Sequence, residues 1–397
     1  MERGVRRRPG GRVGQTADHA ARHRPGPCPE GGRRRRARRR ANAAPGGVDS
    51  PIRHHRTGRD VSEPLRWGIL TTGNIARQFA RDMAGAERGR IVAVGSRDRG
   101  RAAEFAGKFD VPRIHGSYDD LLADPEVEAV YQALPNSMHH EWTIAALSAG
   151  KHVLCEKPFA MTAAEAEEMF DVAEAKGVVL IEAFMYRSHP LTAAVVERVR
   201  RGDIGRLRMI RTSFCFCADT SANVRFDPDL GGGALMDIGC YCVSFSRFLA
   251  QAEPTRIHVV HHRHESAVDD ITAGVLHFDD GLIATFTCGM TLHADNTADL
   301  CGAEGFIEVP IPWKPPVQGA TYVMKRSHPP AQDRARRGPP PPPETIEVNA
   351  GKPLYALEAD DFAATVRNGA APKVTRADTI GNMRVLDEMR RQIAAHR

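Results

Sequence analysis

One lysine in this chain follows a predicted strand in a way that marks it as a candidate catalytic residue. Val153–Cys155 is a short apolar run typical of a buried strand, and Glu156, Lys157 and Pro158 come directly after it. Proline fixes the backbone and removes a hydrogen-bond donor, so it holds Lys157 at the strand tip. Open α/β sheets bind ligands beside the carboxyl ends of their strands. We therefore expect Lys157 to face a binding crevice; the alternative is a solvated charge pair with Glu156.

A carboxylate and a phenol in the second half of the chain could supply acid–base chemistry. Asp237 and Tyr241 lie four residues apart in a helix predicted over residues 234–249, so both should occupy one helix face. The glycines at 231–233 open this helix. We expect Lys157 to place a positive charge near Tyr241 and lower its pKa, with Asp237 orienting the pair. The alternative is a core tyrosine whose hydroxyl has a local partner.

The segment that begins at Leu65 has the order strand, tight turn and helix that a dinucleotide fingerprint requires. Gly73 would let the backbone approach a pyrophosphate, and the small Ala76 would let the helix pack on the strand. Thr71 stands where the first glycine of the fingerprint is expected, which weakens the match. The residues of this turn that we expect to bind the cofactor are Thr71, Gly73, Asn74 and Ile75.

The end of the second predicted strand indicates which cofactor is used. Residues 91–95 are followed by Ser96 and Arg97. An acidic residue at this tip suits the ribose hydroxyls of NAD, whereas an arginine suits the 2′-phosphate of NADP. The sequence therefore favours NADP, with NAD as the alternative; Arg97 could also be a surface residue that opens the next helix.

The elements that would position these residues fall into two groups. The first half alternates strands and helices, which predicts a doubly wound parallel sheet. Its further helices are predicted over 99–109, 118–122, 140–149 and 161–176, and its further strands over 129–134, 153–155 and 178–184. After a helix over 192–201, the second half has strands separated by polar turns, over 207–217, 256–264, 271–278, 282–290 and 300–309. A Pro-rich excursion over 310–343 and helices over 354–367 and 375–395 close the chain.

Charge is distributed unevenly along the 397 residues, which carry a formal net charge of +6. Residues 1–62 contain 17 arginines and 5 acidic residues, a net +12, which leaves −6 for the rest. This Arg-rich segment has few large apolar residues, so we expect it to be disordered, and we hypothesise that it is not translated in the native protein. The acidic remainder argues against a nucleic-acid-binding domain.

Composition also bears on the compartment and on metals. No apolar run approaches a membrane span, and the eight cysteines lack zinc-site spacing, so we expect free thiols in a reducing cytoplasm. His261, His262 and His264 alternate along a predicted strand, which splits them between its two faces. We therefore expect no metal site.

Four motifs together resemble the Gfo/Idh/MocA oxidoreductase family. They are Pro135-Asn136-x-x-His139, Gly150-Lys151-His152-Val153, Glu156-Lys157-Pro158 and Glu182-Ala183-Phe184-Met185-Tyr186-Arg187. The resemblance covers about residues 64–397 and is nearest to the branch of dihydrodiol dehydrogenase and NADP-dependent D-xylose dehydrogenase. It implies a Rossmann domain over 64–184. It also implies a substrate-binding and dimerisation domain over 185–397, with a large open, mainly antiparallel sheet, in a homodimer or homotetramer.

The resemblance also implies roles for individual residues. The cofactor-binding set extends to Ser96, Arg97, Pro135, Asn136, His139, Glu156 and Lys157, and the substrate-binding set is His139, Arg187, His189, Asp237 and Tyr241. Lys157, Tyr241 and Asp237 are the expected catalytic residues. The expected function is hydride transfer between NADP and a hydroxyl-bearing ring, an aldose such as D-xylose or a trans-dihydrodiol. The alternative is a catalytically silent NAD(P)-binding sensor or regulatory subunit.

Overall fold

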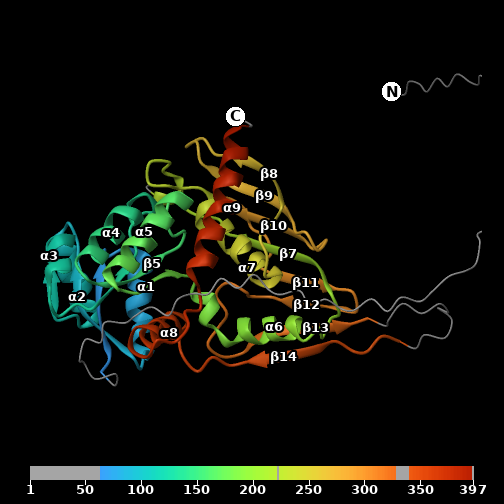
Figure 1. The fold of residues 1–397 in the computed structure, drawn as a ribbon, viewed down its shortest axis with the longest axis horizontal. Coiled ribbons are helices and arrows are strands. Elements are labelled where there is room, and N and C mark those ends of the chain that lie inside the picture. Colours follow the sequence, from blue (N-terminus) through green and yellow to red (C-terminus); the bar gives the residue numbers. More distant parts are fainter. Residues whose placement is uncertain (1–62, 221–222, 328–338, 396–397) are drawn as a thin grey trace, which may run out of the picture. The chain divides into compact units, whose positions relative to one another are not determined.

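The structure is a computed structural model that describes residues 63–220, 223–327 and 339–395, all within one compact unit. The predicted Arg-rich extension over residues 1–62 lies outside the described residues. In the described part, two sheets face each other across a layer of helices (Figure 1). No described helix is both long and apolar enough to span a bilayer.

The first sheet has six parallel strands in the order β3-β2-β1-β4-β5-β6. Its strands are β1 (Leu65–Leu70), β2 (Gly89–Gly95), β3 (Arg113–His115), β4 (Ala129–Gln132), β5 (His152–Glu156) and β6 (Leu180–Ala183). Its helices are α1 (Asn74–Asp82), α2 (Arg99–Phe109), α3 (Tyr118–Ala123), α4 (His139–Ser148) and α5 (Ala163–Lys176), with short 3-10 turns η1 (Met83–Gly85), η2 (Asn136–Met138) and η3 (Met185–Ser188). This arrangement confirms the predicted doubly wound fold.

Local sequence explains where these helices begin. Asp98 caps α2 by accepting a hydrogen bond from the Arg101 amide, and Ser117, which was predicted as a cap, accepts one from the Asp120 amide. Thr162 caps α5 in the same way. Short polar side chains favour such positions because they satisfy amides that have no partner within the helix.

The second sheet has eight strands in the order β14-β13-β12-β11-β7-β10-β9-β8. They are β7 (Leu207–Cys215), β8 (Arg256–Arg263), β9 (Asp269–His277), β10 (Ile283–Gly289), β11 (Ala298–Gly302), β12 (Gly305–Val309), β13 (Ala320–Arg326) and β14 (Glu344–Val348). β7 and β10 run parallel and the other pairs run antiparallel, so the sheet is mainly antiparallel as predicted. The segment that was predicted as a Pro-rich excursion contributes β13 to this sheet, and β14 follows it.

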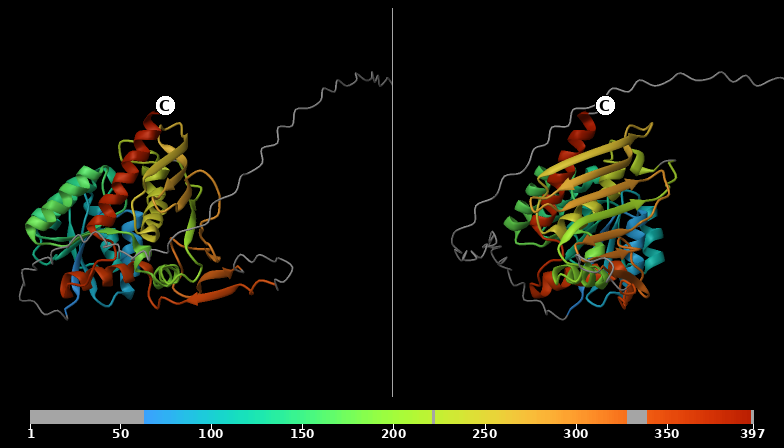
Figure 2. Two further views of the ribbon diagram at one scale, coloured as in Figure 1. Left: turned by 45° about the vertical axis from the view of Figure 1, so that its right-hand side comes forward. Right: turned by 90° about the vertical axis from the view of Figure 1, so that its right-hand side faces the viewer.

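Helices cover one face of the second sheet. They are α6 (Pro190–Arg200), α7 (Cys240–Ala250) and α9 (Arg376–Ala395), and the 3-10 turn η4 (Val224–Phe226) and the π-helical segment η5 (Leu235–Gly239) precede α7. Figure 2 shows the opposite face turned toward the viewer, with no described helix in front of it. Residues on the strands of this sheet alternate between buried and partly exposed, which fits a sheet with one covered face.

Helix α8 (Leu354–Asn368) returns from the second half of the chain to the first sheet. The Asp360 carboxylate accepts hydrogen bonds from the Glu87 and Arg88 amides at 3.0 and 2.7 Å. The Phe362 ring lies 5.0 Å from the Trp67 ring of β1. The predicted domain boundary at residue 184 therefore assigns α8 to the second domain, although this helix packs on the first sheet.

Candidate functional site

Lys157, at the tip of β5, contacts Asp237, which lies in η5 of the second half of the chain. Lys157 follows β5, and its Nζ donates to the Asp237 carbonyl oxygen at 2.7 Å and to Asp237 Oδ1 at 3.0 Å. The other carboxylate oxygen of Asp237 accepts a hydrogen bond from Arg225 Nε at 2.6 Å. One carboxylate thus lies between two cations, at the position where open α/β sheets bind ligands.

The charges in this group reinforce one another. Burial would raise the pKa of Asp237, but the Lys157 and Arg225 charges outweigh that effect and hold the pKa at about 2. Burial would also lower the pKa of Lys157, yet the Asp237 charge raises it above its ordinary value. Both groups are therefore ionised at neutral pH, and Lys157 is an ammonium with a proton to donate.

Asp237 lies in a π-helical segment that the sequence did not predict. Residues Leu235–Gly239 adopt this wider turn before α7 begins, whereas an α-helix was predicted throughout. Asp269 supports the segment by accepting the Leu235 amide at 2.7 Å. Gly233 allows this approach, because its φ is +121° and an added Cβ would lie 2.3 Å from Asp269 Oδ1. Single π turns inside α-helices are frequent at functional sites.

Tyr241 lies beside Lys157, but the predicted lowering of its pKa is wrong. The Lys157 Nζ lies over the Tyr241 ring, 5.1 Å from its centroid. The hydroxyl donates to Met185 Sδ at 3.2 Å. Burial raises the pKa of Tyr241 well above its ordinary value, and the nearby carboxyl groups of Glu156 and Asp237 raise it further.

Aromatic side chains form a wall around Tyr241 that sequence reasoning missed in part. Trp313 comes from the Pro-rich segment, is 2% exposed, and donates from Nε1 to the Ser213 carbonyl at 2.8 Å. The rings whose centroids lie within 6 Å of Tyr241 are those of Phe184, Tyr186, Phe214 and Trp313. These rings pack on one another and fix the position of Tyr241 beside Lys157.

The predicted dinucleotide turn has the backbone shape that a glycine-rich loop would give. Thr71 adopts a φ of +88°, a backbone conformation that residues other than glycine rarely take. Helix α1 begins after Gly73, and no side chain in the described part of the chain caps it. The amides of Asn74 and Ile75 therefore belong to a helix N-terminus that favours an anion, as a pyrophosphate-binding turn requires.

The tip of β2 matches an NADP site better than an NAD site. Arg97 is exposed there. Ser96 is buried, with its Oγ accepting the Asp98 amide at 3.2 Å. The Asp98 carboxylate caps α2, so the acidic group nearest the tip already has a partner.

Two other residues predicted to bind cofactor, Asn136 and Glu156, are held by protein contacts. The Asn136 Nδ2, one residue after Pro135, donates to the Gly231 carbonyl at 2.8 Å and joins the two domains. Glu156 is buried; its Oε1 accepts the Tyr131 hydroxyl and its Oε2 accepts the Lys157 amide at 3.2 Å. Burial raises the Glu156 pKa. These residues support the loops around Lys157.

His139, Arg187 and His189 were expected in the substrate pocket, and the structure gives them other partners. The ring nitrogens of His139 lie 2.9 and 2.8 Å from the Pro158 and Leu134 carbonyl oxygens, and burial lowers its pKa to about 4. Arg187 donates to the Lys373 carbonyl at 2.8 Å with its guanidinium over Phe248.

His189 caps the first turn of α6. Its Nδ1 accepts the Leu191 amide at 3.0 Å, and its Nε2 lies 3.2 Å from the Pro316 carbonyl oxygen. All three side chains are buried. These contacts hold the three side chains in place, and their role in substrate binding stays a prediction.

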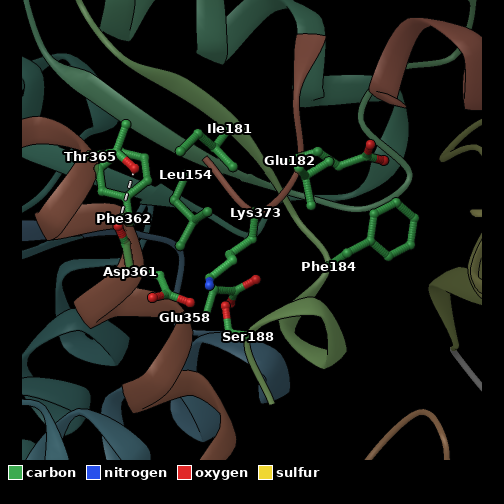
Figure 3. Close-up of a pocket in the computed structure, with 11 residues that line it drawn as sticks. Leu154, Ile181, Glu182, Phe184, Ser188, Glu358, Asp361, Phe362, Thr365 and Lys373 are labelled. Carbon is green, nitrogen blue, oxygen red and sulfur yellow. Dashed lines mark hydrogen bonds between the residues drawn. The ribbon is translucent and has the colours of Figure 1, made fainter. Parts of the chain in front are cut away.

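A separate small cavity lies between the first sheet and α8. Its volume is about 20 Å³, enough for one water molecule. Figure 3 shows Glu358, Asp361, Ser188 and Lys373 gathered on one side of it, with the Glu182 carboxylate on another. The Oε2 atoms of Glu182 and Glu358 are buried without a hydrogen-bond partner among the described residues. Burial raises the Glu182 pKa to about 8.

Comparisons with known proteins agree on both halves of the chain. Residues 65–184 match a family model described as the Gfo/Idh/MocA oxidoreductase family with an NAD-binding Rossmann fold, and residues 192–308 match the C-terminal domain model of the same family. Mouse trans-1,2-dihydrobenzene-1,2-diol dehydrogenase is 35% identical over 83% of this chain and 97% of its own length. D-xylose 1-dehydrogenase (NADP(+)) 2 of Haloferax volcanii is 33% identical over 81% of this chain and 95% of its own length.

Solved structures of other oxidoreductases are similar to this chain over most of its length. A 3-ketoreductase from Actinomadura kijaniata in complex with NADP and TDP-benzene has a TM-score of 0.73 and 28% identity, covering 83% of this chain and 98% of its own. An aldose-aldose oxidoreductase from Caulobacter crescentus complexed with glycerol has a TM-score of 0.73 and 26% identity, covering 84% of this chain and 99% of its own.

Proposed function

Because this chain belongs to the Gfo/Idh/MocA oxidoreductase family, we propose that it is an NADP-dependent dehydrogenase that interconverts a ring hydroxyl and a carbonyl group. The observation that carries this proposal is the Lys157–Asp237 pair, which lies where β5 of the nucleotide-binding sheet meets η5 of the second domain. The named relatives act on sugars or dihydrodiols, so the proposed substrate is an aldose such as D-xylose or a trans-dihydrodiol.

NADP fits the residues at the other end of the crevice. The uncapped N-terminus of α1 and the Thr71–Gly73 turn would hold the pyrophosphate, and Arg97 would bind the 2′-phosphate. When bound, NADP supplies or accepts the hydride at the reacting carbon.

Lys157 is the proposed proton-transfer group. In the direction of carbonyl reduction, its ammonium donates a proton to the substrate oxygen while the carbon receives the hydride. In the direction of oxidation, a neutral Lys157 must accept the hydroxyl proton. Since Asp237 raises the Lys157 pKa, the ammonium form, which reduction requires, dominates at neutral pH.

Tyr241 is proposed to hold the substrate. Its hydroxyl is bound to a thioether sulfur, which is a weak acceptor that a substrate oxygen can replace. Asp237 fixes the Lys157 ammonium and stays ionised, so it positions the donor without exchanging the proton. Arg225 holds the second carboxylate oxygen of Asp237 in place.

The direct test is turnover by the purified protein. We expect NADPH absorbance to rise when the protein is mixed with NADP⁺ and D-xylose or a trans-dihydrodiol, and to rise far more slowly with NAD⁺. The protein would instead be a silent sensor if it binds the cofactor but no aldose or diol reduces bound NADP⁺ and no lactone or ketose oxidises bound NADPH.

We also propose that the protein forms a homodimer or homotetramer through the outer face of the second sheet. We propose as well that it works in a reducing cytoplasm, where its thiols stay reduced. Several apolar residues share that face, which no described helix covers: Met209, Val260, Ile271, Val275, Ile283 and Phe306. Val260 is 71% exposed, and large exposed apolar patches mark contact surfaces. The seven described cysteines are free thiols.

A further inference from the structure

Positive charge exceeds negative charge around the reacting end of the crevice. Lys157 and Arg225 both contact Asp237, so this one carboxylate balances only one of the two cations. Lys314 adds a third cation to the same neighbourhood. Glu156 is a further buried carboxyl, whose pKa burial raises. Even with Glu156 ionised, the three cations Lys157, Arg225 and Lys314 face only two carboxylates.

Arg225 has donors left for a ligand. Only its Nε is used by Asp237, and its two terminal nitrogens make no hydrogen bond within the described residues. Its side chain is 42% exposed, and its guanidinium lies 5.6 Å from the centroid of Phe216. A guanidinium with free terminal nitrogens offers the planar fork that binds a carboxylate or a phosphate with two hydrogen bonds.

Lys314 follows Trp313, whose indole donates to the Ser213 carbonyl and whose ring centroid lies 5.9 Å from that of Tyr241. The charges of Lys157, Asp237 and Arg225 act on Lys314, which places its ammonium in the same neighbourhood. Lys314 is exposed and forms no ion pair with any residue in the described ranges. Although the residue reaches solvent, the surrounding protein displaces water from its ammonium, and this desolvation together with the nearby Lys157 charge lowers the pKa of Lys314.

We propose that the substrate of this site is an anionic sugar, a ring that carries a carboxylate or a phosphate away from its reacting carbon, with Arg225 and Lys314 binding the anionic group. This inference rests on the proposed dehydrogenase function. Asp237 leaves part of the positive charge of Lys157, Arg225 and Lys314 unbalanced, so these cations repel one another. An anionic ligand would turn that repulsion into attraction. The reacting hydroxyl lies at Lys157, and the anionic group lies on the side of Arg225 and Lys314.

The competing explanation is that Arg225 only orients Asp237 and that Lys314 is a solvated surface residue. Arg225 cannot separate these explanations, because its replacement would also disturb Asp237. Lys314 can, because it makes no described hydrogen bond to the catalytic pair. Lys325 is a matched control: it is a partly exposed lysine on β13 whose Nζ pairs with Glu308 at 2.7 Å.

The test compares three sugars that share the reacting ring: D-glucose, D-glucuronate and D-glucose 6-phosphate. We expect kcat/KM with NADP⁺ to be higher for at least one anionic sugar than for D-glucose. Lys314→Gln should lower the ratio of anionic to neutral kcat/KM by about tenfold or more, because a charge-assisted hydrogen bond is lost. Lys325→Gln should leave the ratio unchanged. The two anionic sugars separate a carboxylate site from a phosphate site.

Isothermal titration calorimetry on the NADPH-loaded protein keeps this inference separate from the proposed function. If no sugar is turned over but D-glucuronate or D-glucose 6-phosphate binds more tightly than D-glucose, and Lys314→Gln removes the difference, the anionic subsite stands and the proposed reaction fails. Equal affinities for charged and neutral sugars, or a ratio that Lys314→Gln does not move, would overturn the subsite.

Discussion

The ammonium of Lys157 lies 3.0 Å from Asp237 Oδ1, although 80 residues separate them in the sequence. This contact joins the tip of a parallel strand to a π turn of the other domain. The two charges hold each other ionised, so Lys157 carries the proton that the proposed reduction requires.

Lys157→Met should lower kcat by about 10²–10⁴-fold, because it removes the proposed proton-transfer group. Asp237→Asn should lower kcat less, since the amide oxygen of asparagine can still accept a hydrogen bond from Lys157. Combining the two changes should give less than the product of the single effects. NADPH binding, followed by fluorescence, should change little in all three variants. Multiplicative losses would show that Lys157 and Asp237 act independently.

Tyr241→Phe should lower kcat/KM by only about two- to tenfold, the contribution of one neutral hydrogen bond. The ring and its packing remain, and the raised pKa of the hydroxyl makes it a poor proton acceptor. Steady-state kinetics with NADP⁺ checks this. A loss of about 10³-fold or more in kcat would make Tyr241 the proton-transfer group, as the sequence alone suggested.

The first sheet could be predicted from sequence because its strands are buried apolar runs separated by clear turn and cap residues. The Lys157 position followed from the same pattern. The contact that decides its chemistry did not, because spacing in a helix cannot show a π turn or the direction of a lysine. Arg225 lies in a short 3-10 turn, and Trp313 and Lys314 lie in an irregular segment. Neither segment has a periodic pattern, so only the folded chain shows that these residues lie near Lys157 and Tyr241.

Thr71→Gly should raise the free energy of unfolding by about 1 kcal/mol. A β-branched residue at a φ of +88° is strained by roughly 1–3 kcal/mol, and glycine relieves this while adding entropy to the unfolded chain. Thr72→Gly is the control, since Thr72 does not have a positive φ and should lose stability. Urea denaturation measures both. Destabilisation by Thr71→Gly would mean that the threonine side chain has a stabilising contact of its own.

Arg97→Asp should weaken the binding of NADP⁺ far more than the binding of NAD⁺. Loss of one charge-assisted hydrogen bond corresponds to about 1.5–3 kcal/mol, or roughly a tenfold to hundredfold rise in the NADP⁺ Kd. Arg97→Gln should have a smaller effect, because it removes the charge without adding repulsion. If titration with both cofactors gives equal changes, Arg97 does not bind the 2′-phosphate.

Glu182→Gln should stabilise the protein in a way that grows with pH. The ordinary pKa of glutamate is 4.5, and burial raises that of Glu182 to about 8 in the fold. Between these values the unfolded chain loses a proton that the folded protein keeps. The contribution of this group to the free energy of unfolding is therefore fully present below pH 4.5 and is lost as pH rises to about 8.

Glutamine cannot ionise, so the variant should escape this loss. Its oxygen can still accept the Phe159 amide, which lies 3.2 Å from Glu182 Oε1. Each pKa unit corresponds to about 1.4 kcal/mol, so the difference between variant and wild type should reach a few kcal/mol near pH 8 and shrink toward pH 5. Urea denaturation across this range measures it, with Glu104→Gln as an exposed control, its side chain being 66% exposed. A difference that stays constant with pH would mean that Glu182 is already ionised in the folded protein.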